Sequence, residues 1–449
     1  MSNKKTTPSL RGTPPKEGND SPSLKGWQAK PDGVVPRLRF PEFQNAGKWE
    51  EKRLGDVCEL ITKGTTPTTL GFSYEQKGIR FIKIESINGD SQIDVSRTPF
   101  ISAECDRALA RSRLVENDIL FSIAGALGVI GKIEKEHLPA NTNQALAILR
   151  LKAMVLNAFV CHQLRSEHVQ IAVEKIKAGA AQFNISLSQL GNFRIYFPEQ
   201  LEQQKIADCL SSIEDLITAQ TQKLNTLKTH KKGLMQQLFP AEGETLPKLR
   251  FPEFQDAGEW EENPIGKVAE IVTGNTPSTA NRHYYGGDRI FVSPADIGDN
   301  RYVTKTKTML TESGFKETRI VNANSILFVC IGSTIGKIAQ NTIDCATNQQ
   351  INSVIPFDGY SNDFIYSALE NNANRIAAIA GNHAVPIINK TAFSNTIILF
   401  PSMPEQEKIA GCLSTIDVLI ATQTQKLSKL KSHKKALMQQ LFPVHENDM

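Results

Sequence analysis

The sequence predicts a tandem repeat of two mixed α/β domains (α+β), each followed by a long helix. A stretch of 38 residues, 203–240, returns at 406–443 with 27 positions identical. A shorter phrase, 36–44, returns at 247–255, and each copy is soon followed by Gly-x-Trp-Glu-Glu. Between these matched parts the copies agree only in scattered places. We therefore expect one shared scaffold that carries two different surfaces.

The chain begins with 35 residues that are rich in Pro, Gly, Ser and Lys, with hardly an aromatic side chain. Such a composition buries too little apolar surface to fold, and we expect a disordered N-terminal extension over 1–35. The matched phrases then divide the remaining chain into a first variable domain at 36–202, a first helix at 203–240, a second variable domain at 241–405, a second helix at 406–443 and a tail at 444–449.

The two variable domains contain short apolar runs bounded by glycines and Thr-Pro turns, a pattern that is typical of strands. Longer amphipathic segments predict helices at 158–176 and 361–379. We expect strands at 79–84, 118–123, 144–151 and 193–197 in the first domain, and at 290–292, 325–331, 351–356 and 396–400 in the second.

Both long helices carry an apolar seam with the heptad spacing of a coiled coil, in which steps of four and three residues alternate. Two matched seams in one chain favour pairing with each other over separate packing on each domain. The seam residues are Ile206, Leu210, Ile213, Ile217, Leu224, Leu227, Leu234 and Leu238, and then Ile409, Leu413, Ile416, Ile420, Leu427, Leu430, Leu437 and Leu441, with Gln220, Lys231, Gln423 and Lys434 in the gaps.

The connection between the two helices predicts their direction. A whole domain, and not a tight turn, joins the first helix to the second, and a repeat within one chain is most simply closed by a pseudo-two-fold axis. An axis perpendicular to the helices makes them antiparallel. Roughly 34 helical residues then give a rod of about 50 Å, which we expect to separate the two domains.

The composition excludes several classes of protein. The apolar runs are too short and interrupted for a membrane span, and no secretory signal is visible, so we expect a cytoplasmic protein without a membrane partner. The seven cysteines form no C-x-x-C pair and the eight histidines show no ligand spacing. We therefore expect buried free thiols, including Cys209 and Cys412, and no metal site.

Basic residues gather near the ends of both helices, at 223–232 and 426–435, although the net charge of the chain is only +4. Two interpretations stay open for these segments. Lysines at a helix end can be solvated charges that complement the helix dipole, or they can contact phosphate.

No catalytic motif is visible in the chain. Gly332-Ser-Thr-Ile-Gly-Lys337 is one residue too short between its glycines for a nucleotide-binding loop and lacks the following Ser or Thr, so it predicts a turn between strands, as does 128–132. The Asp/Asn-Pro-Pro-aromatic motif of amino-methyltransferases, the G-x-S-x-G elbow and H-E-x-x-H are all missing. We expect a protein that is not an enzyme and has no catalytic residues.

Several phrases, each present twice and in the same order, resemble the specificity subunit of type I restriction-modification systems. The resemblance covers nearly everything from Pro36 onward. It depends on Leu-Arg-Phe-Pro-Glu-Phe at 38–43 and 249–254, a Thr-Pro loop at 62–67 and 273–277, Ile-Gly-Lys at 130–132 and 335–337, Asn-Gln at 143–144 and 348–349, and a Glu-Gln helix start at 198–203 and 401–406. The second copy departs from the first at 381–386, so the resemblance implies no DNA-contacting role for these residues.

The resemblance implies two target recognition domains that each read one half of a split site in double-stranded DNA. The helices would act as a spacer and as the docking surface for two modification subunits. Those partners would hold S-adenosylmethionine, and a restriction subunit would use ATP and Mg²⁺, so no cofactor is expected in this chain. The alternatives are a duplicated scaffold or adaptor that binds only proteins, and, less favoured, an enzyme fused to a reader.

Reading of base edges needs donors and acceptors presented from loops or strand ends. As DNA-contacting residues we predict Lys63, Thr65, Thr66, Arg80, Lys83, Glu85, Asn88, Gln182 and Asn184 in the first domain, and Asn275, Thr276, Ser293, Asp296, Arg301 and Lys305 in the second. Any one of them can instead be a solvated loop residue or a turn former.

Overall fold

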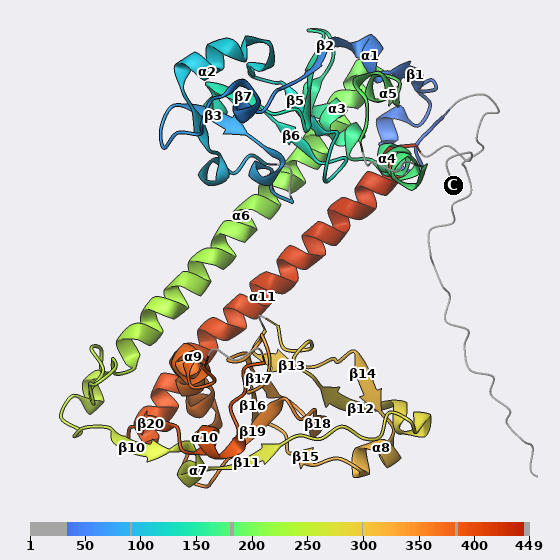
Figure 1. Cartoon of the computed structure of the whole chain (residues 1–449). Helices are drawn as coiled ribbons and strands as arrows, with labels where there is room; N and C mark the ends of the chain where they lie inside the picture. Colours follow the sequence, from blue (N-terminus) through green and yellow to red (C-terminus); the bar gives the residue numbers. More distant parts are fainter. Residues whose placement is uncertain (1–33, 90–91, 180–183, 299, 382–384, 444–449) are drawn as a thin grey trace, which may run out of the picture. The chain divides into compact units, whose positions relative to one another are not determined.

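A computed structural model describes residues 34–89, 92–179, 184–298, 300–381 and 385–443 (Figure 1). The chain divides into two compact units, one containing residues up to Ser212 together with those from Lys434 onward, and the other spanning Ile213–His433. Each unit contains one variable domain and parts of both long helices. The predicted extension, apart from residues 34 and 35, and the predicted tail lie outside the described residues. The predicted domain boundaries stay predictions.

The first unit contains three sheets, in the strand orders β1-β9, β2-β8-β5-β6 and β4-β3-β7. All neighbours are antiparallel except β3 and β7, which run parallel. The elements are β1 (Glu50–Arg53), α1 (Leu54–Val57), β2 (Cys58–Lys63), β3 (Ile79–Ile82), β4 (Phe100–Ile101), α2 (Ala103–Ala108), β5 (Ile119–Ser122), β6 (Ile130–Lys132), β7 (Ala140–Thr142), β8 (Leu146–Leu151), α3 (Asn157–Leu164), α4 (Glu167–Gly179), α5 (Leu187–Gly191) and β9 (Arg194–Phe197).

The second unit repeats this plan with two additional edge strands, in the orders β10-β20, β11-β19-β16-β17-β13 and β14-β12-β18-β15. Its elements are β10 (Glu261–Pro264), α7 (Ile265–Val268), β11 (Ala269–Thr273), β12 (Tyr285–Val292), β13 (Tyr302–Val303), β14 (Thr308–Leu310), α8 (Glu312–Lys316), β15 (Ile320–Val321), β16 (Ile326–Val329), β17 (Ile338–Asn341), β18 (Cys345–Thr347), β19 (Ile351–Pro356), α9 (Asn362–Ala378), α10 (Lys390–Ser394) and β20 (Ile397–Phe400).

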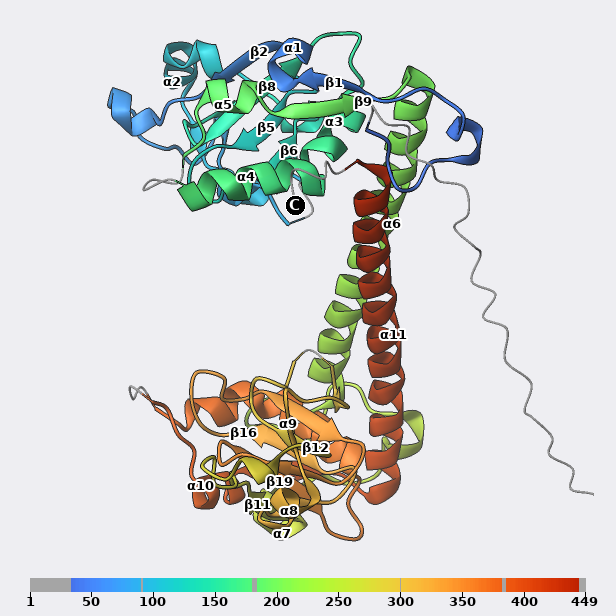
Figure 2. The same ribbon diagram turned by 90° about the vertical axis from the view of Figure 1, so that its right-hand side faces the viewer.

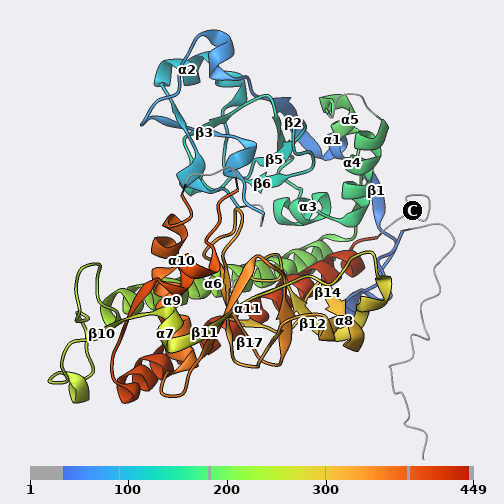
Figure 3. The same cartoon turned by 60° about the horizontal axis from the view of Figure 1, so that its bottom comes forward.

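Helices cover one face of the larger sheet in each unit. In the first unit α3 and α4 lie beside β5 and β6 (Figure 2). In the second unit α9 packs against β16, β17 and β19, and Figure 3 labels α9 and β17. The prediction of one helix at 158–176 is wrong in one respect, because a turn at Arg165 and Ser166 divides this segment into α3 and α4. The predicted helix at 361–379 is confirmed as α9.

The predicted repeat is also visible in the backbone conformation. Asn117 and Asn324, which precede β5 and β16, are the two residues other than glycine with positive φ among those described, at 71° and 65°. Asparagine adopts this left-handed conformation more readily than most residues. The phrase Asn-x-Ile-Leu-Phe thus recurs because each copy needs the same tight turn before a buried strand.

The two long helices are α6 (Gln200–Leu238) and α11 (Met403–Leu441), which begin three residues before the predicted starts. In the second unit they pack together through buried Leu224, Ile416 and Ile420, with half-buried Leu227, Leu234 and Leu427 around them.

The packed segments run antiparallel, as predicted. Gln423 donates a hydrogen bond to the side-chain oxygen of Gln220, and further along α6 the ammonium group of Lys231 lies 2.7 Å from the carboxylate of Asp417. A higher residue number on α6 thus faces a lower number on α11. Gln220 and Gln423 occupy the same position in the two repeats, so the pair marks the centre of the seam.

The outer parts of the seam have an additional role, which the heptad pattern did not indicate. Ile206 and Leu210 join the core of the first domain, together with Leu441 at the end of α11 and Phe442 directly after it. Ile409 and Leu413 likewise join the core of the second domain, together with residues from the end of α6. Each helix therefore contributes one end to each unit.

All seven cysteines are free, and burial raises the pKa of the Cys58, Cys330 and Cys345 thiols to about 12. Cys209 and Cys412 are half-buried, which corrects the prediction that they are buried. Among the described helices, none is both long and apolar enough to cross a membrane.

Candidate nucleic-acid interface

The two repeated phrases of the scaffold meet in an ion pair at the start of each long helix. Arg39 binds Glu202 in a bidentate fashion, with N–O distances of 2.7 and 2.5 Å, and Arg250 binds Glu405 in the same way at 2.8 and 2.8 Å. Both carboxylates are fully buried. The leading phrase at 36–44 and 247–255 is therefore repeated because its arginine anchors the domain to the helix.

The strand register of the first unit brings four loops to one edge. Lys63, at the end of β2, lies opposite Ala147, and Ser122, at the end of β5, lies opposite Leu146. The end of β3 pairs in parallel with the end of β7, which leads directly through 143–145 into β8. We define the first loop edge as the residues at these strand ends, 63–66, 83–88, 123–125 and 142–145, together with Asn184, which forms a bridge with Ala124.

The second unit builds an equivalent edge from equivalent strands. The end of β11 lies opposite the start of β19, as does the end of β16, while the end of β12 pairs in parallel with the end of β18. The loop 348–350 then connects β18 to β19. We call residues 273–276, 293–296, 330–332, 347–350 and 385–387 the second loop edge.

A close approach of two loops is built into both edges. A Cβ atom on Gly64 would lie 1.7 Å from the carbonyl oxygen of Thr142, and one on Gly274 would lie 2.2 Å from that of Thr347. Only glycine allows this approach. The Thr-Pro loop and the Asn-Gln loop are thus pressed together in each domain.

Side chains join the same two loops across the close approach. Thr66 donates a hydrogen bond to Gln144, and Thr276 donates one to Gln349 at 2.8 Å. An arginine also holds the carbonyl at the end of the preceding strand, because Arg319 donates to the oxygen of Thr273 at 2.7 Å. Neither glutamine was among the predicted site residues, although both belong to the repeated Asn-Gln phrases.

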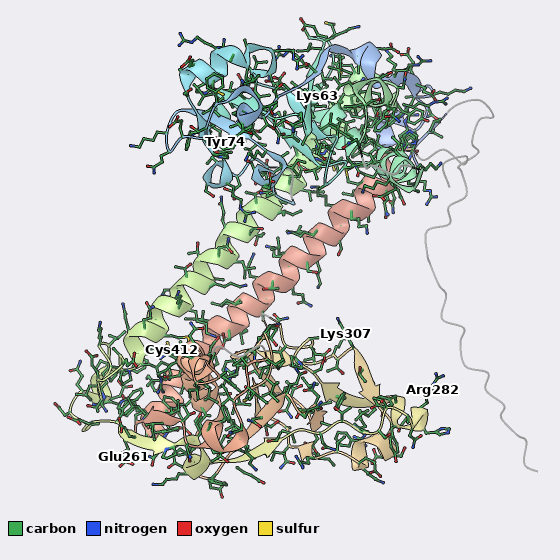
Figure 4. All side chains as sticks on the ribbon, viewed as in Figure 1. Lys63, Tyr74, Glu261, Arg282, Lys307 and Cys412 are labelled. Atoms are coloured by element: carbon green, nitrogen blue, oxygen red, sulfur yellow. The ribbon has the colours of Figure 1, made fainter. Side chains whose placement is uncertain are left out.

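Most of the predicted residues of the first domain lie on the first loop edge. They are Lys63, Thr65, Thr66, Lys83, Glu85, Asn88 and Asn184, all exposed or half-buried. Lys63 and Tyr74 are labelled in Figure 4, and the ammonium group of Lys83 lies 4.2 Å from the centre of the Tyr74 ring. Arg80 lies within β3 and donates to the carbonyl oxygen of Glu136 at 3.3 Å, so the structure places it away from the edge. Gln182 lies outside the described residues.

In the second domain, four predicted residues lie on the second loop edge, and several of them stabilise its turns. Ser293 donates to Asp296 at 2.6 Å, and the other carboxylate oxygen of Asp296 accepts from the backbone of Lys307 at 2.8 Å. Asn275 bridges to the segment before β15 through the backbone of Glu317 and Arg319. Thr276 is exposed. Lys305, in the connection from β13 to β14, is exposed but lies off the edge.

Arg301 has a structural position that does not suit base reading. Its side chain is 3% exposed and is surrounded by acceptors. The guanidinium donates to Gln340 at 3.0 and 2.8 Å, reaches Asp417 at 3.3 Å and also binds Asp363, while it stacks over Tyr366 at 4.4 Å. This arginine joins the second domain to α11.

Lys231 and Glu370 belong to the same buried network. The ammonium group of Lys231 lies 2.6 Å from Glu370 and 2.7 Å from Asp417. Burial raises the pKa of Glu370, and the neighbouring Lys231 opposes this shift. Burial also raises the pKa of Tyr366 well above its usual range. In the segment 223–232, therefore, at least this lysine serves packing and not phosphate contact.

The chemistry that the loop edges offer is hydrogen bonding by hydroxyl, amide and ammonium groups. Within the part of the chain that the structure describes, no group of three or more His, Cys, Asp or Glu side chains could hold a metal ion. The hydroxyl, amide and ammonium groups that face outward are those that recognise base edges and phosphates.

Comparison with known proteins gives a consistent result. The profile described as "Type I restriction modification DNA specificity domain" matches residues 46–229 and 257–432. The putative type I restriction enzyme MjaX specificity subunit of Methanocaldococcus jannaschii is 25% identical over 422 residues, which cover 88% of this chain and 92% of that protein. The type I restriction enzyme HindI specificity subunit of Haemophilus influenzae is 32% identical over 148 residues, 32% of each chain.

Among solved structures, the crystal structure of the S subunit of a type I restriction-modification system from M. genitalium has the same fold. It superposes with a TM-score of 0.62 at 16% sequence identity and covers 92% of this chain and 100% of that one.

Proposed function

This chain belongs to the family of type I restriction-modification DNA specificity subunits, and we propose that its two variable domains read the two halves of one bipartite, asymmetric DNA site. A specificity subunit is the non-catalytic, DNA-recognising part of a restriction-modification complex. We assign 36–202 and 241–405 as its two target recognition domains.

The observation that carries this proposal is the presence of the same loop edge in both units with different side chains. The framework residues Gly64 and Gly274 are the same, and so are the contacts of Thr66 and Thr276. Around this framework, Lys63 in the first domain is replaced by Thr273 in the second. A common framework with variable groups suits two readers of different sequences.

The proposed contacts follow from the groups that major-groove base edges require. Amides pair with adenine, basic side chains with guanine or phosphate, and hydroxyls with several bases. We propose that the readers are Lys63, Thr65, Thr66, Lys83, Glu85, Asn88, Gln144 and Asn184 in the first domain and Asn275, Thr276, Ser293, Asp296 and Gln349 in the second. Arg80, Arg301 and Lys305 are left out because they lie off the edges.

The near-identical helices are proposed to dock two copies of one modification subunit. Leu216 and Leu419 occupy the same position of the two repeats, and each is 50% exposed. Leu38 and Leu249 in the leading phrases are likewise equivalent and are 39% and 45% exposed. Exposed apolar side chains that recur in register support two equal docking surfaces. S-adenosylmethionine would be bound by those subunits, and ATP with Mg²⁺ by a restriction subunit.

Mapping of methylated adenines in the host genome tests the proposal. We expect a two-part motif whose halves lie about one helical turn, roughly 34 Å, apart. Replacement of residues 50–198 by the equivalent region of another such subunit should change one half only. A continuous motif, or a replacement that changes both halves or neither, would contradict the assignment of one reader to each domain.

A further inference from the structure

We propose that Ile387 and Val385 of the second domain read an A·T base pair through apolar contact with the 5-methyl group of thymine. The inference rests on the proposed function, because it assumes that the second loop edge faces the major groove. There, thymine alone among the four bases presents a methyl group, and aliphatic side chains recognise it.

Both side chains are unusually exposed for aliphatic residues at a polar edge. Val385 is 65% exposed and Ile387 is 52% exposed. Ile387 forms a bridge with Ile331, whose carbonyl oxygen accepts a hydrogen bond from Gln350 at 3.4 Å, and Gln350 in turn binds the amide of Asn348 at 2.9 Å. Exposure of these two apolar side chains to water is unfavourable in the free protein. Contact with an apolar group of a binding partner removes this surface from water and so stabilises the complex.

Backbone contacts hold residues 386–388 and so fix the position of Ile387. Gly332 donates to the carbonyl oxygen of Pro386 at 3.0 Å, and Ile388 donates to that of Cys330 at 2.8 Å. Ile387 forms a bridge with Ile331, and the next side chain, Ile388, is buried. Because valine and isoleucine have few side-chain rotamers, their binding to a base loses little conformational entropy.

The first domain has the same backbone arrangement with a different side chain. Asn184 forms a bridge with Ala124, as Ile387 does with Ile331, and Ile185 donates to Ile123 at 2.8 Å, as Ile388 does to Cys330. Asn184 is therefore the structural counterpart of Ile387. An amide suits the N6 and N7 atoms of adenine, whereas an aliphatic group suits the thymine methyl, so one position can distinguish the two half-sites.

The experiment uses the complex of this chain with its modification subunits and duplexes that carry the mapped motif. In the half-site assigned to the second domain by the exchange of 50–198, each thymidine is replaced in turn by deoxyuridine, which lacks only the 5-methyl group. We expect one replacement to weaken binding about four-fold, the effect of one buried methyl group. In Ile387→Asn or Val385→Ser, duplexes with and without that methyl group should bind equally.

Ile343→Asn is the matched control. Ile343 is 54% exposed and precedes β18, at the end of that strand away from the second loop edge, so this variant should keep the preference for thymidine. Tolerance of deoxyuridine at every position of the half-site, or a half-site without an A·T pair, would overturn the inference. An Ile387→Asn complex that still prefers thymidine would also overturn it. So would loss of a modification subunit from the Ile387→Asn complex, because that loss would place the side chain at a protein interface.

These outcomes are separable from failure of the proposed function. If the complex binds a bipartite motif but ignores the methyl group, only the reading by Ile387 and Val385 is refuted. If the motif is continuous, the assignment of one reader to each domain is refuted first.

Discussion

Removal of the Arg250 side chain tests whether the buried ion pair holds the second domain to its helix. In Arg250→Met the carboxylate of Glu405, which is 0% exposed, loses both guanidinium hydrogen bonds of 2.8 Å. These hydrogen bonds raise the pKa of Arg250, so the pair with Glu405 stabilises the charged guanidinium. Loss of one partner from a buried pair costs about 3–5 kcal/mol, because the remaining charge has no water to solvate it.

The expected loss is measured by thermal and urea unfolding of the full chain. A cost of this size lowers the Tm of a domain of 150–250 residues by roughly 6–20 °C. Removal of both charges, in Arg250→Met with Glu405→Leu, should restore most of the stability, since an apolar pair of similar volume replaces the ion pair. The matched control is Lys408→Met, whose partner Glu253 lies 3.0 Å away in the same two phrases.

The side chains of Lys408 and Glu253 are 52% and 46% exposed, so this control should cost at most about 1 kcal/mol. If Arg250→Met is as mild as the control, or if the double variant is no more stable than the single one, the ion pair does not anchor the domain. The same variants at Arg39 and Glu202 should affect the first unit equally.

Three further changes have expected outcomes. Gly274→Ala places a Cβ atom 2.2 Å from a facing carbonyl oxygen and should cost about 1–3 kcal/mol in urea unfolding, whereas Gly258→Ala, with no atom within 4 Å, should be neutral. Leu224→Asp puts an unpaired charge into the helix seam and should destabilise the second unit by several kcal/mol, so an unchanged Tm would refute the pairing of the helices. Lys231→Met removes the group that opposes the raised pKa of Glu370. Since a carboxyl with a raised folded-state pKa binds its proton more readily when folded, this variant should lose stability relative to the parent as the pH rises above about 4.5 and regain it on acidification. Addition of Glu370→Gln should remove that pH dependence.

The scaffold could be predicted because duplication and periodicity act on neighbouring residues. The strand predicted at 351–356 coincides with β19, and α9 is the helix predicted at 361–379 without its first and last residues. The break between α3 and α4 could not be predicted, because neither Gly nor Pro marks it. Ser166 at the break is 1% exposed, so the chain turns inside the core at the polar stretch 165–167, whose residues also fit a continuous amphipathic helix.

The candidate site was harder to predict because its loops are brought together by pairing of distant strands. The parallel pairs β3 with β7 and β12 with β18 decide which loops meet, and no local pattern announces a parallel pair. Arg301 is a further example with the same cause. It was predicted to contact DNA because its side chain offers suitable donors, but its partner Asp417 lies in a helix 116 residues later.

The buried network around Lys231 predicts a limit on the domains that this scaffold can accept. Each unit has one buried arginine–glutamate pair, because both partners of that pair lie in the repeated phrases. Lys231 is part of the repeated helix, but its partner Glu370 belongs to the variable domain. Counted from the helix starts Asn157 and Asn362, the first domain has Arg165 at the position of Glu370. A domain with arginine at this position would leave Lys231 with Asp417 as its carboxylate partner and would bring a second positive charge to a site where charges are desolvated. We therefore expect compatibility of charge at this joint, and not only the choice of DNA sequence, to limit the domains that the second position can carry.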